Sequence, residues 1–90
     1  MDDTEQMNER VEVIAAFYTD TTEVHIAIPR KMLYKGREII FTEFGLRHPT
    51  SKGQRMVHVF DMSDGSNDYR LEFDAARLVW HLTAMRAGEI

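Results

Sequence analysis

Residues 56–74, MVHVFDMSDGSNDYRLEFD, decide the fold class of this chain. Before the DGSN tetrapeptide at 64–67 apolar residues, among them Val57 and Val59, occupy both faces of a predicted strand, and after it apolar and polar side chains alternate as in a half-buried strand. The alternating apolar or half-polar positions are Met56, His58, Phe60 and Met62 before the tetrapeptide, and Tyr69, Leu71 and Phe73 after it. Because Asp, Gly and Asn accept the backbone dihedrals of tight turns, this stretch predicts an antiparallel β-hairpin.

The segment after this hairpin predicts one more strand. Leu78, Trp80 and Leu82 share a phase and alternate with Val79, His81 and Thr83, so Trp80 is expected in the core. The strand is expected to end near residue 85. A short connection at 74–77 joins it to the hairpin.

The segment before the hairpin predicts at least two strands. Residues 23–28 alternate strictly, and Pro29, which cannot donate a ladder hydrogen bond, should mark a strand end, a bulge or an edge. Lys35-Gly36 predicts a hairpin turn, since glycine supplies the positive φ that such turns need. The return strand at 37–44 has apolar residues on both faces, with Ile39 and Ile40 adjacent, and is therefore expected to be central or covered on both sides. Residues 47–55, RHPTSKGQR, predict a surface loop.

The N-terminal third leaves two readings open. Residues 11–18, VEVIAAFY, alternate as a strand, but Val11, Ile14, Ala15 and Tyr18 also fit a helical stripe. The density of β-branched and aromatic residues favours the strand, and a short N-terminal helix within residues 5–18 is the alternative. We expect residues 1–10 to be a disordered acidic tail, residues 11–86 to be a single β domain, and residues 87–90 to be a frayed tail.

The chain as a whole is predicted to be mainly β, with five to six short antiparallel strands. Their arrangement is expected to be a meander, a curled sheet or a small open barrel. Its 90 residues suffice for one domain, and its 43% hydrophobic and 29% charged residues are typical of a globular protein. There are no cysteines, hence neither disulfides nor thiolate zinc sites. With no signal-like start and no apolar run near the roughly 20 residues that span a bilayer, a cytoplasmic protein without a membrane partner is expected.

Charge is unevenly distributed along the chain. The net charge is -4, yet residues 29–60 carry +5 between acidic flanks. The candidate binding surface is the basic set at the predicted hairpin tip and loop: Lys31, Lys35, Arg37, Arg47, His48, Lys52 and Arg55. Interleaved aromatics at 34, 41 and 44 make single-stranded nucleic acid one candidate partner, by phosphate neutralisation and base stacking. The competing interpretation is that these charges pair with the acidic flanks and that the aromatics are core.

Other site chemistries find little support in the sequence. The histidines, His25, His48, His58 and His81, have no metal-ligand spacing, and no metal or cofactor is predicted. Asp61, Asp64, Asn67 and Asp68 surround Gly65, but an EF-hand register would place Phe60 at a position that needs an acid. No nucleophile elbow or phosphate-binding glycine loop is present, so no catalytic residue is predicted.

The succession PRKMLYKGREI from Pro29, followed by DYRLEFD at 68–74 and WHL at 80–82, resembles small uncharacterised bacterial β domains. Some of those domains look like companions or tails of Y-family DNA polymerases. Ile39 stands where that pattern has an aromatic residue, and the middle loop lacks a tryptophan. The resemblance implies a nucleic-acid context and carries over no active residue.

These observations favour a noncatalytic interaction module whose partner is a protein or a nucleic acid, with the basic surface at residues 30–55. A structural or homo-oligomeric β protein, in which an apolar sheet face pairs with its own copy, is the second hypothesis. A small enzyme is the third.

Overall fold

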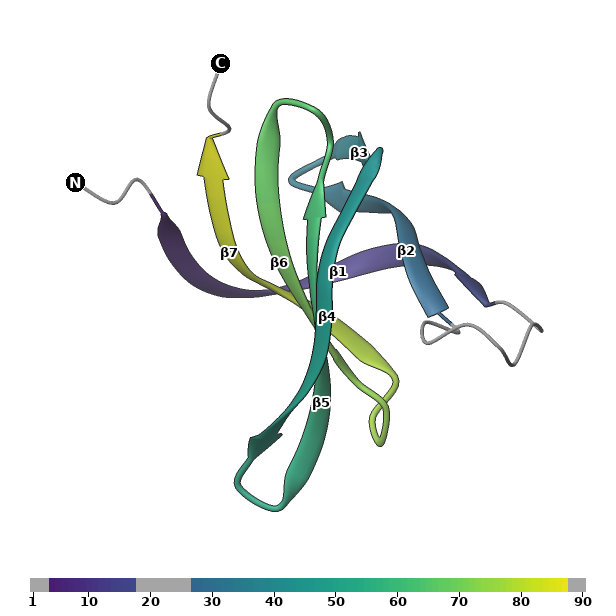
Figure 1. Ribbon diagram of the computed structural model, residues 1–90, viewed down its shortest axis with the longest axis vertical. Helices are drawn as coiled ribbons and strands as arrows, with labels where there is room; N and C mark the ends of the chain where they lie inside the picture. Colours follow the sequence, from purple (N-terminus) through teal and green to yellow (C-terminus); the bar gives the residue numbers. More distant parts are fainter. Residues whose placement is uncertain (1–3, 18–26, 88–90) are drawn as a thin grey trace.

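Seven antiparallel strands form one curled sheet, an open half-barrel (Figure 1). The structure, a computed structural model, describes residues 4–17 and 27–87, with all their side chains except those of Leu46 and Lys52. The strands are β1 (Glu5–Phe17), β2 (Ala27–Tyr34), β3 (Arg37–Ile40), β4 (Glu43–Lys52), β5 (Arg55–Ser63), β6 (Asn67–Asp74) and β7 (Val79–Ala87). Their order in the sheet is β3-β2-β1-β7-β6-β5-β4. The predicted mainly β curled sheet is confirmed, with seven strands instead of five to six.

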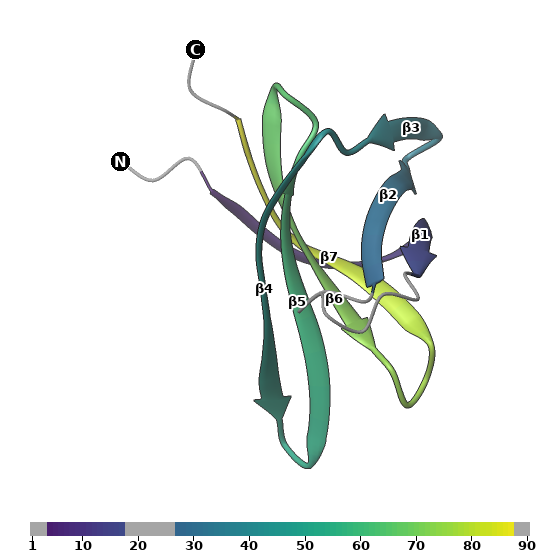
Figure 2. The ribbon, with the colours of Figure 1, turned by 45° about the vertical axis from the view of Figure 1, so that its right-hand side comes forward.

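Strand β1 belongs to two half-sheets. Its residues from Glu5 to Val11 pair with β7, and those from Glu12 to Phe17 pair with β2. The β1–β3 half therefore curls away from the β4–β7 half, as Figure 2 shows. The alternative of an N-terminal helix is wrong, and so is a tail that reaches residue 10. Pairing with β7 and the packing of Met7 and Val11 against the core override the polar composition of this stretch.

The predicted loop at residues 47–55 is also wrong, because it is a second long hairpin. Strand β4 runs to Lys52 and β5 starts at Arg55, with Gly53 at φ 64° in the turn between them. Pro49 lies inside β4, where its missing N–H is tolerated because β4 is an edge strand. Pro29 pairs with Ala15 next to a bulge in β2, where Arg30 is the extra residue, so of the three predicted roles of this proline the structure shows the bulge. Most of the strand predicted at 23–28 lies outside the described residues, and β2 begins at Ala27.

The core fills the space between the two half-sheets. Its buried members are Met32, Ile39, Phe41, Phe60, Met62, Tyr69, Leu71 and Leu82. Phe60 is at an aromatic junction, with ring centroids 5.4 Å from Trp80 and 6.4 Å from Phe44. Trp80 packs against the core as predicted but is only half-buried, and Leu78 is exposed because it belongs to the β6–β7 turn.

The connection between β3 and β4 ties the half-sheets together at one end. The Phe41 N–H donates to the Arg30 carbonyl at 2.9 Å, and the next N–H, of Thr42, donates to the Ser63 carbonyl at 2.8 Å. Two adjacent residues thus bond to β2 in one half and to β5 in the other. Since β3 and β4 form the two edges, the sheet is not closed by strand pairing.

The β2–β3 turn offers a test of local turn chemistry. Lys35 and Gly36 have φ values of 50° and 75°, as a type I′ turn requires at both central positions. Gly36→Ala should destabilise the protein by about 1–2 kcal/mol, purely through the backbone, because a Cβ there would contact nothing within 4 Å. Lys35→Asn should stabilise it by a few tenths of a kcal/mol, since Asn tolerates positive φ better. Urea unfolding measures both, and a Gly36→Ala variant as stable as the parent would contradict this account of the turn.

Candidate functional site

The structure divides the predicted basic surface between two hairpins. Lys31, Lys35 and Arg37 belong to the β2–β3 hairpin, whereas the other four residues belong to β4 and β5. These hairpins form opposite edges of the sheet, and their tips point away from each other in both views (Figures 1 and 2). The basic residues therefore do not form one patch.

At the β2–β3 hairpin, the cations have partners within the chain. Lys31 forms an ion pair with Glu38 on the neighbouring strand. The Lys35 ammonium lies 5.3 Å from the centre of the Tyr34 ring. A hydrogen bond and charge interaction with the Tyr34 hydroxyl, assisted by Glu9, raise the pKa of Lys35. Arg37 is exposed.

At the β4–β5 hairpin, two of the cations support the fold. Arg55 forms an ion pair with the buried carboxylate of Asp74. Arg47 Nη2 lies 3.3 Å from His58 Nδ1 across the strand pair, and His48 is exposed.

The interleaved aromatics are part of the core. Phe41 is buried, and Tyr34 and Phe44 are half-buried and pack against the core cluster. They are not arranged as an open stacking platform beside the cations. The competing interpretation of the sequence fits the aromatics and Arg55, which pairs with Asp74 of the acidic C-terminal flank, whereas Lys31 pairs with Glu38 inside the basic segment.

A second surface, which the sequence reasoning missed, lies on the outer face of β1–β3. Strand pairing aligns Ile14, Lys31 and Ile40 in one row and Glu12, Leu33 and Glu38 in the next. The aliphatic side chains are exposed by 58% at Ile14, 45% at Leu33 and 61% at Ile40. Residues in the alternate phase, Met32 and Ile39, are buried in the core. The prediction that the return strand is covered on both sides is therefore wrong, and its second apolar phase faces outward.

This outer face continues into a hollow beside β1. The hollow, about 740 Å³ in volume, is lined in part by Leu33, Lys35, Leu78 and Trp80. Leu78 is exposed and has a φ of 59°, in the left-handed region that costs a leucine on the order of 1 kcal/mol. Leu78 thus lines the same hollow as Leu33, on the side of the β6–β7 turn.

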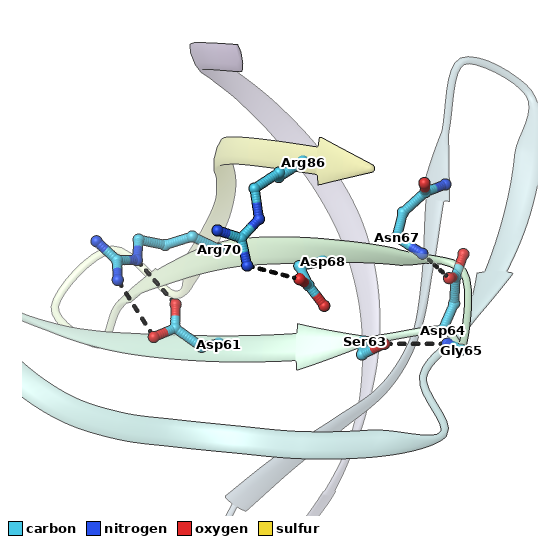
Figure 3. Close-up of polar contacts among 8 residues, drawn as sticks. All are labelled: Asp61, Ser63, Asp64, Gly65, Asn67, Asp68, Arg70 and Arg86. Carbon is cyan, nitrogen blue, oxygen red and sulfur yellow. Dashed lines mark hydrogen bonds and ion pairs between the residues drawn. The ribbon is translucent and has the colours of Figure 1, made fainter. Parts of the chain in front are cut away.

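A groove of about 570 Å³ crosses the outer surface of β4–β7, and charged pairs line it. Arg70 donates to both Asp61 carboxylate oxygens, at 2.8 and 3.2 Å, and Arg86 donates to Asp68 at 3.0 Å (Figure 3). These are cross-strand ion-pair ladders, which hold neighbouring strands in register. Their charges are directed at each other instead of converging on the groove.

No family model, curated protein or solved structure matches this chain. The similarity to companions of Y-family polymerases therefore stays a prediction.

Metal chemistry gains no support from the described part of the chain. Within residues 4–17 and 27–87, no three His, Asp or Glu residues are grouped so that they could hold a metal ion, and His25 lies outside these ranges. The same residues contain no helix that is long and apolar enough to span a membrane.

The acidic cluster at 61–68 is a hairpin turn. Asp64 accepts hydrogen bonds from the backbone N–H groups of Ser66 at 2.8 Å and Asn67 at 2.7 Å, and from the Tyr69 hydroxyl at 2.9 Å (Figure 3 shows the bond from Asn67). The Ser63 hydroxyl accepts from the Gly65 N–H at 3.0 Å. The turn predicted from DGSN is confirmed, and its oxygens are occupied by internal donors.

The Asp64 bonds predict a dependence of stability on pH. Burial opposes ionisation of this carboxyl, but the hydrogen bonds from Asn67, Ser66 and Tyr69 outweigh it and hold the pKa below its ordinary value of 3.8. Stabilisation from this group is therefore complete above the ordinary pKa and is lost as the pH falls through the folded-state value. Asp64→Asn should be less stable than the parent at about pH 6, and the gap should narrow toward about pH 3. Unfolding curves across this range measure it, and a gap that stays constant would contradict the assignment.

Proposed function

We propose that this chain is a noncatalytic protein-interaction module that binds through the outer face of β1–β3. The observation that carries the proposal is that Ile14, Leu33 and Ile40 are exposed on the face opposite the core, where Leu33 lies diagonally across from the other two. Scattered exposed aliphatics are common on protein surfaces, but several of them gathered on one face of a sheet are typical of an interaction site. Lys31 lies between Ile14 and Ile40, and Glu12 and Glu38 lie on either side of Leu33.

A noncatalytic role is supported by the state of the polar groups. Enzyme sites bring titratable side chains together in a concave pocket with perturbed proton affinities. Here Asp61 and Asp68, which line the β4–β7 groove, pair across strands with Arg70 and Arg86. Both hollows described above are open to solvent.

A protein partner is favoured over single-stranded nucleic acid by the placement of the cations. Phosphate binding needs a continuous basic track, often beside exposed aromatic rings. Lys31 and Arg55 form ion pairs, the two hairpins lie at opposite edges, and the nearby aromatics pack into the core. We expect a labelled single-stranded oligonucleotide to show no saturable binding at low salt. Tight binding that weakens steeply with salt would favour the basic hairpins instead.

Site-directed photo-cross-linking tests the proposed face. A benzophenone amino acid at position 40 is compared with the same group at position 56 on β5, where Met56 is 54% exposed. In cells of the native source, position 40 should form a discrete protein adduct that position 56 does not form. Leu33→Ser in the same chain should abolish the adduct. Equal labelling from both positions, or none, would overturn the proposal.

A further inference from the structure

The outer face of β1–β3 carries a pattern of charge that is complementary to itself. One row across the three strands reads Glu12, Leu33, Glu38, which is acidic, apolar, acidic. The neighbouring row reads Ile14, Lys31, Ile40, which is apolar, basic, apolar. Each row has the charges that would complement the other row. Within one molecule both rows point in the same direction, and Lys31 forms an ion pair with Glu38 of the neighbouring row.

We infer that the partner of this face is a second copy of this chain, stacked face to face with its strands antiparallel to those of the first. This inference rests on the proposed function. The twofold axis lies in the plane of the interface and runs perpendicular to the strands. It places the row Glu12, Leu33, Glu38 of each copy over the row Ile14, Lys31, Ile40 of the other. Leu33 then lies on the aliphatic stem of Lys31 from the second copy, with that copy's Ile14 and Ile40 on either side. The Lys31 ammonium lies between two acids, Glu12 and Glu38.

The other simple twofold stacking is excluded by electrostatics. An axis parallel to the strands would place Lys31 against its own symmetry mate and Glu12 against Glu38. Like charges that face each other across an interface are unfavourable and prevent pairing. The charge pattern therefore selects one of the two arrangements. Packed sheets of this kind lie about 10 Å apart, a distance that aliphatic side chains fill.

The face is small, so the association should be weak and reversible. Three aliphatic side chains per copy correspond to an interface at the low end of specific protein contacts. Sedimentation velocity on the purified full chain from about 10 µM to about 1 mM should show a shift from monomer toward dimer by mass action. Leu33→Ser should raise the dimer dissociation constant at least about tenfold. Met56→Ser is the matched control on β5, where the side chain is exposed to a similar degree, and should leave it unchanged.

A charge swap tests whether these charges hold the two copies together. Lys31→Glu alone should abolish self-association, as should the double variant Glu12→Lys/Glu38→Lys, because each would confront like charges. A mixture of the two should form a heterodimer, since acidic residue 31 of one chain then meets basic residues 12 and 38 of the other. Far-ultraviolet circular dichroism of each variant checks that it is folded. No heterodimer from folded variants would overturn the arrangement.

The outcomes separate the inference from the proposed function. A strict monomer at about 1 mM overturns the second copy as partner. If residue 40 still cross-links to a different protein in cells, the interaction function stands and only the identity of the partner fails. If neither self-association nor a specific adduct is found, both fail. If Leu33→Ser and Met56→Ser raise the dimer dissociation constant equally, self-association uses another surface, and the inference is overturned as well.

Discussion

Replacing Phe60 with alanine is expected to lower the free energy of unfolding by about 3–5 kcal/mol, the usual cost of deleting a buried aromatic ring. Phe60 is 2% exposed, and its ring contacts both Trp80 and Phe44. Its removal leaves a cavity at the junction of the core aromatics, which the strands around it can close only in part. Domains of this size are stable by only about 5–15 kcal/mol, so the loss is a large share of the total.

Thermal and urea unfolding measure this change, with Met56→Ala on the same strand as its control. Met56 is exposed, and its truncation should change stability by less than about 0.5 kcal/mol. For a domain of about this length, the Phe60 variant should melt at least about 12 °C below the parent. Equal melting temperatures for the two variants would show that the core is not centred on Phe60.

Asp74→Ala is expected to destabilise the protein by about 2–3 kcal/mol, because it leaves several donors without an acceptor. The buried Asp74 carboxylate accepts from the N–H groups of Ala76 at 3.0 Å and Arg77 at 3.2 Å, and it pairs with Arg55. These bonds shape the β6–β7 turn and join it to β5. Asp74→Asn keeps one side-chain oxygen and should cost less, about 1 kcal/mol.

The matched control is Asp68→Ala, which removes an exposed ion pair. Asp68 bonds Arg86 at 3.0 Å, and both side chains are about half exposed, so solvent screens most of this interaction. A loss below about 1 kcal/mol is expected from urea unfolding. If Asp68→Ala proved as damaging as Asp74→Ala, burial would not be what distinguishes the two carboxylates.

The parts of the fold that could be predicted are those with local causes. Lys35-Gly36 and the DGSN turn each carry the residues that their dihedrals and hydrogen bonds require, and both turns lie where expected. The strand at residues 5–10 could not be predicted, because its polar residues are held by pairing with β7 at the other end of the chain. The continuation of β4 through Pro49 is likewise tolerated by its edge position, which depends on the order of the whole sheet.

The candidate site could be predicted less well than the fold. The charge count along the chain located the basic residues, but it could not show that Lys31 and Arg55 have acidic partners or that the two hairpins lie apart. The signal for the exposed face was present in the adjacent Ile39 and Ile40. When both faces of a strand carry apolar residues, either a second layer of structure covers the outer face or that face is exposed. A chain of 90 residues has few residues left to form a second layer.

The position of β1 between β2 and β7 also bears on how fast the chain can fold. Val11 pairs with Trp80, so this part of the sheet forms only after a loop of about 70 residues has been closed. The chain loses the conformational entropy of this loop before the contacts between β1 and β7 can stabilise it. The hairpins β2–β3, β4–β5 and β5–β6 can form early from neighbouring residues. We therefore expect folding to be limited by the docking of β1 onto β7, with rates in the slow range typical of β proteins with distant pairings.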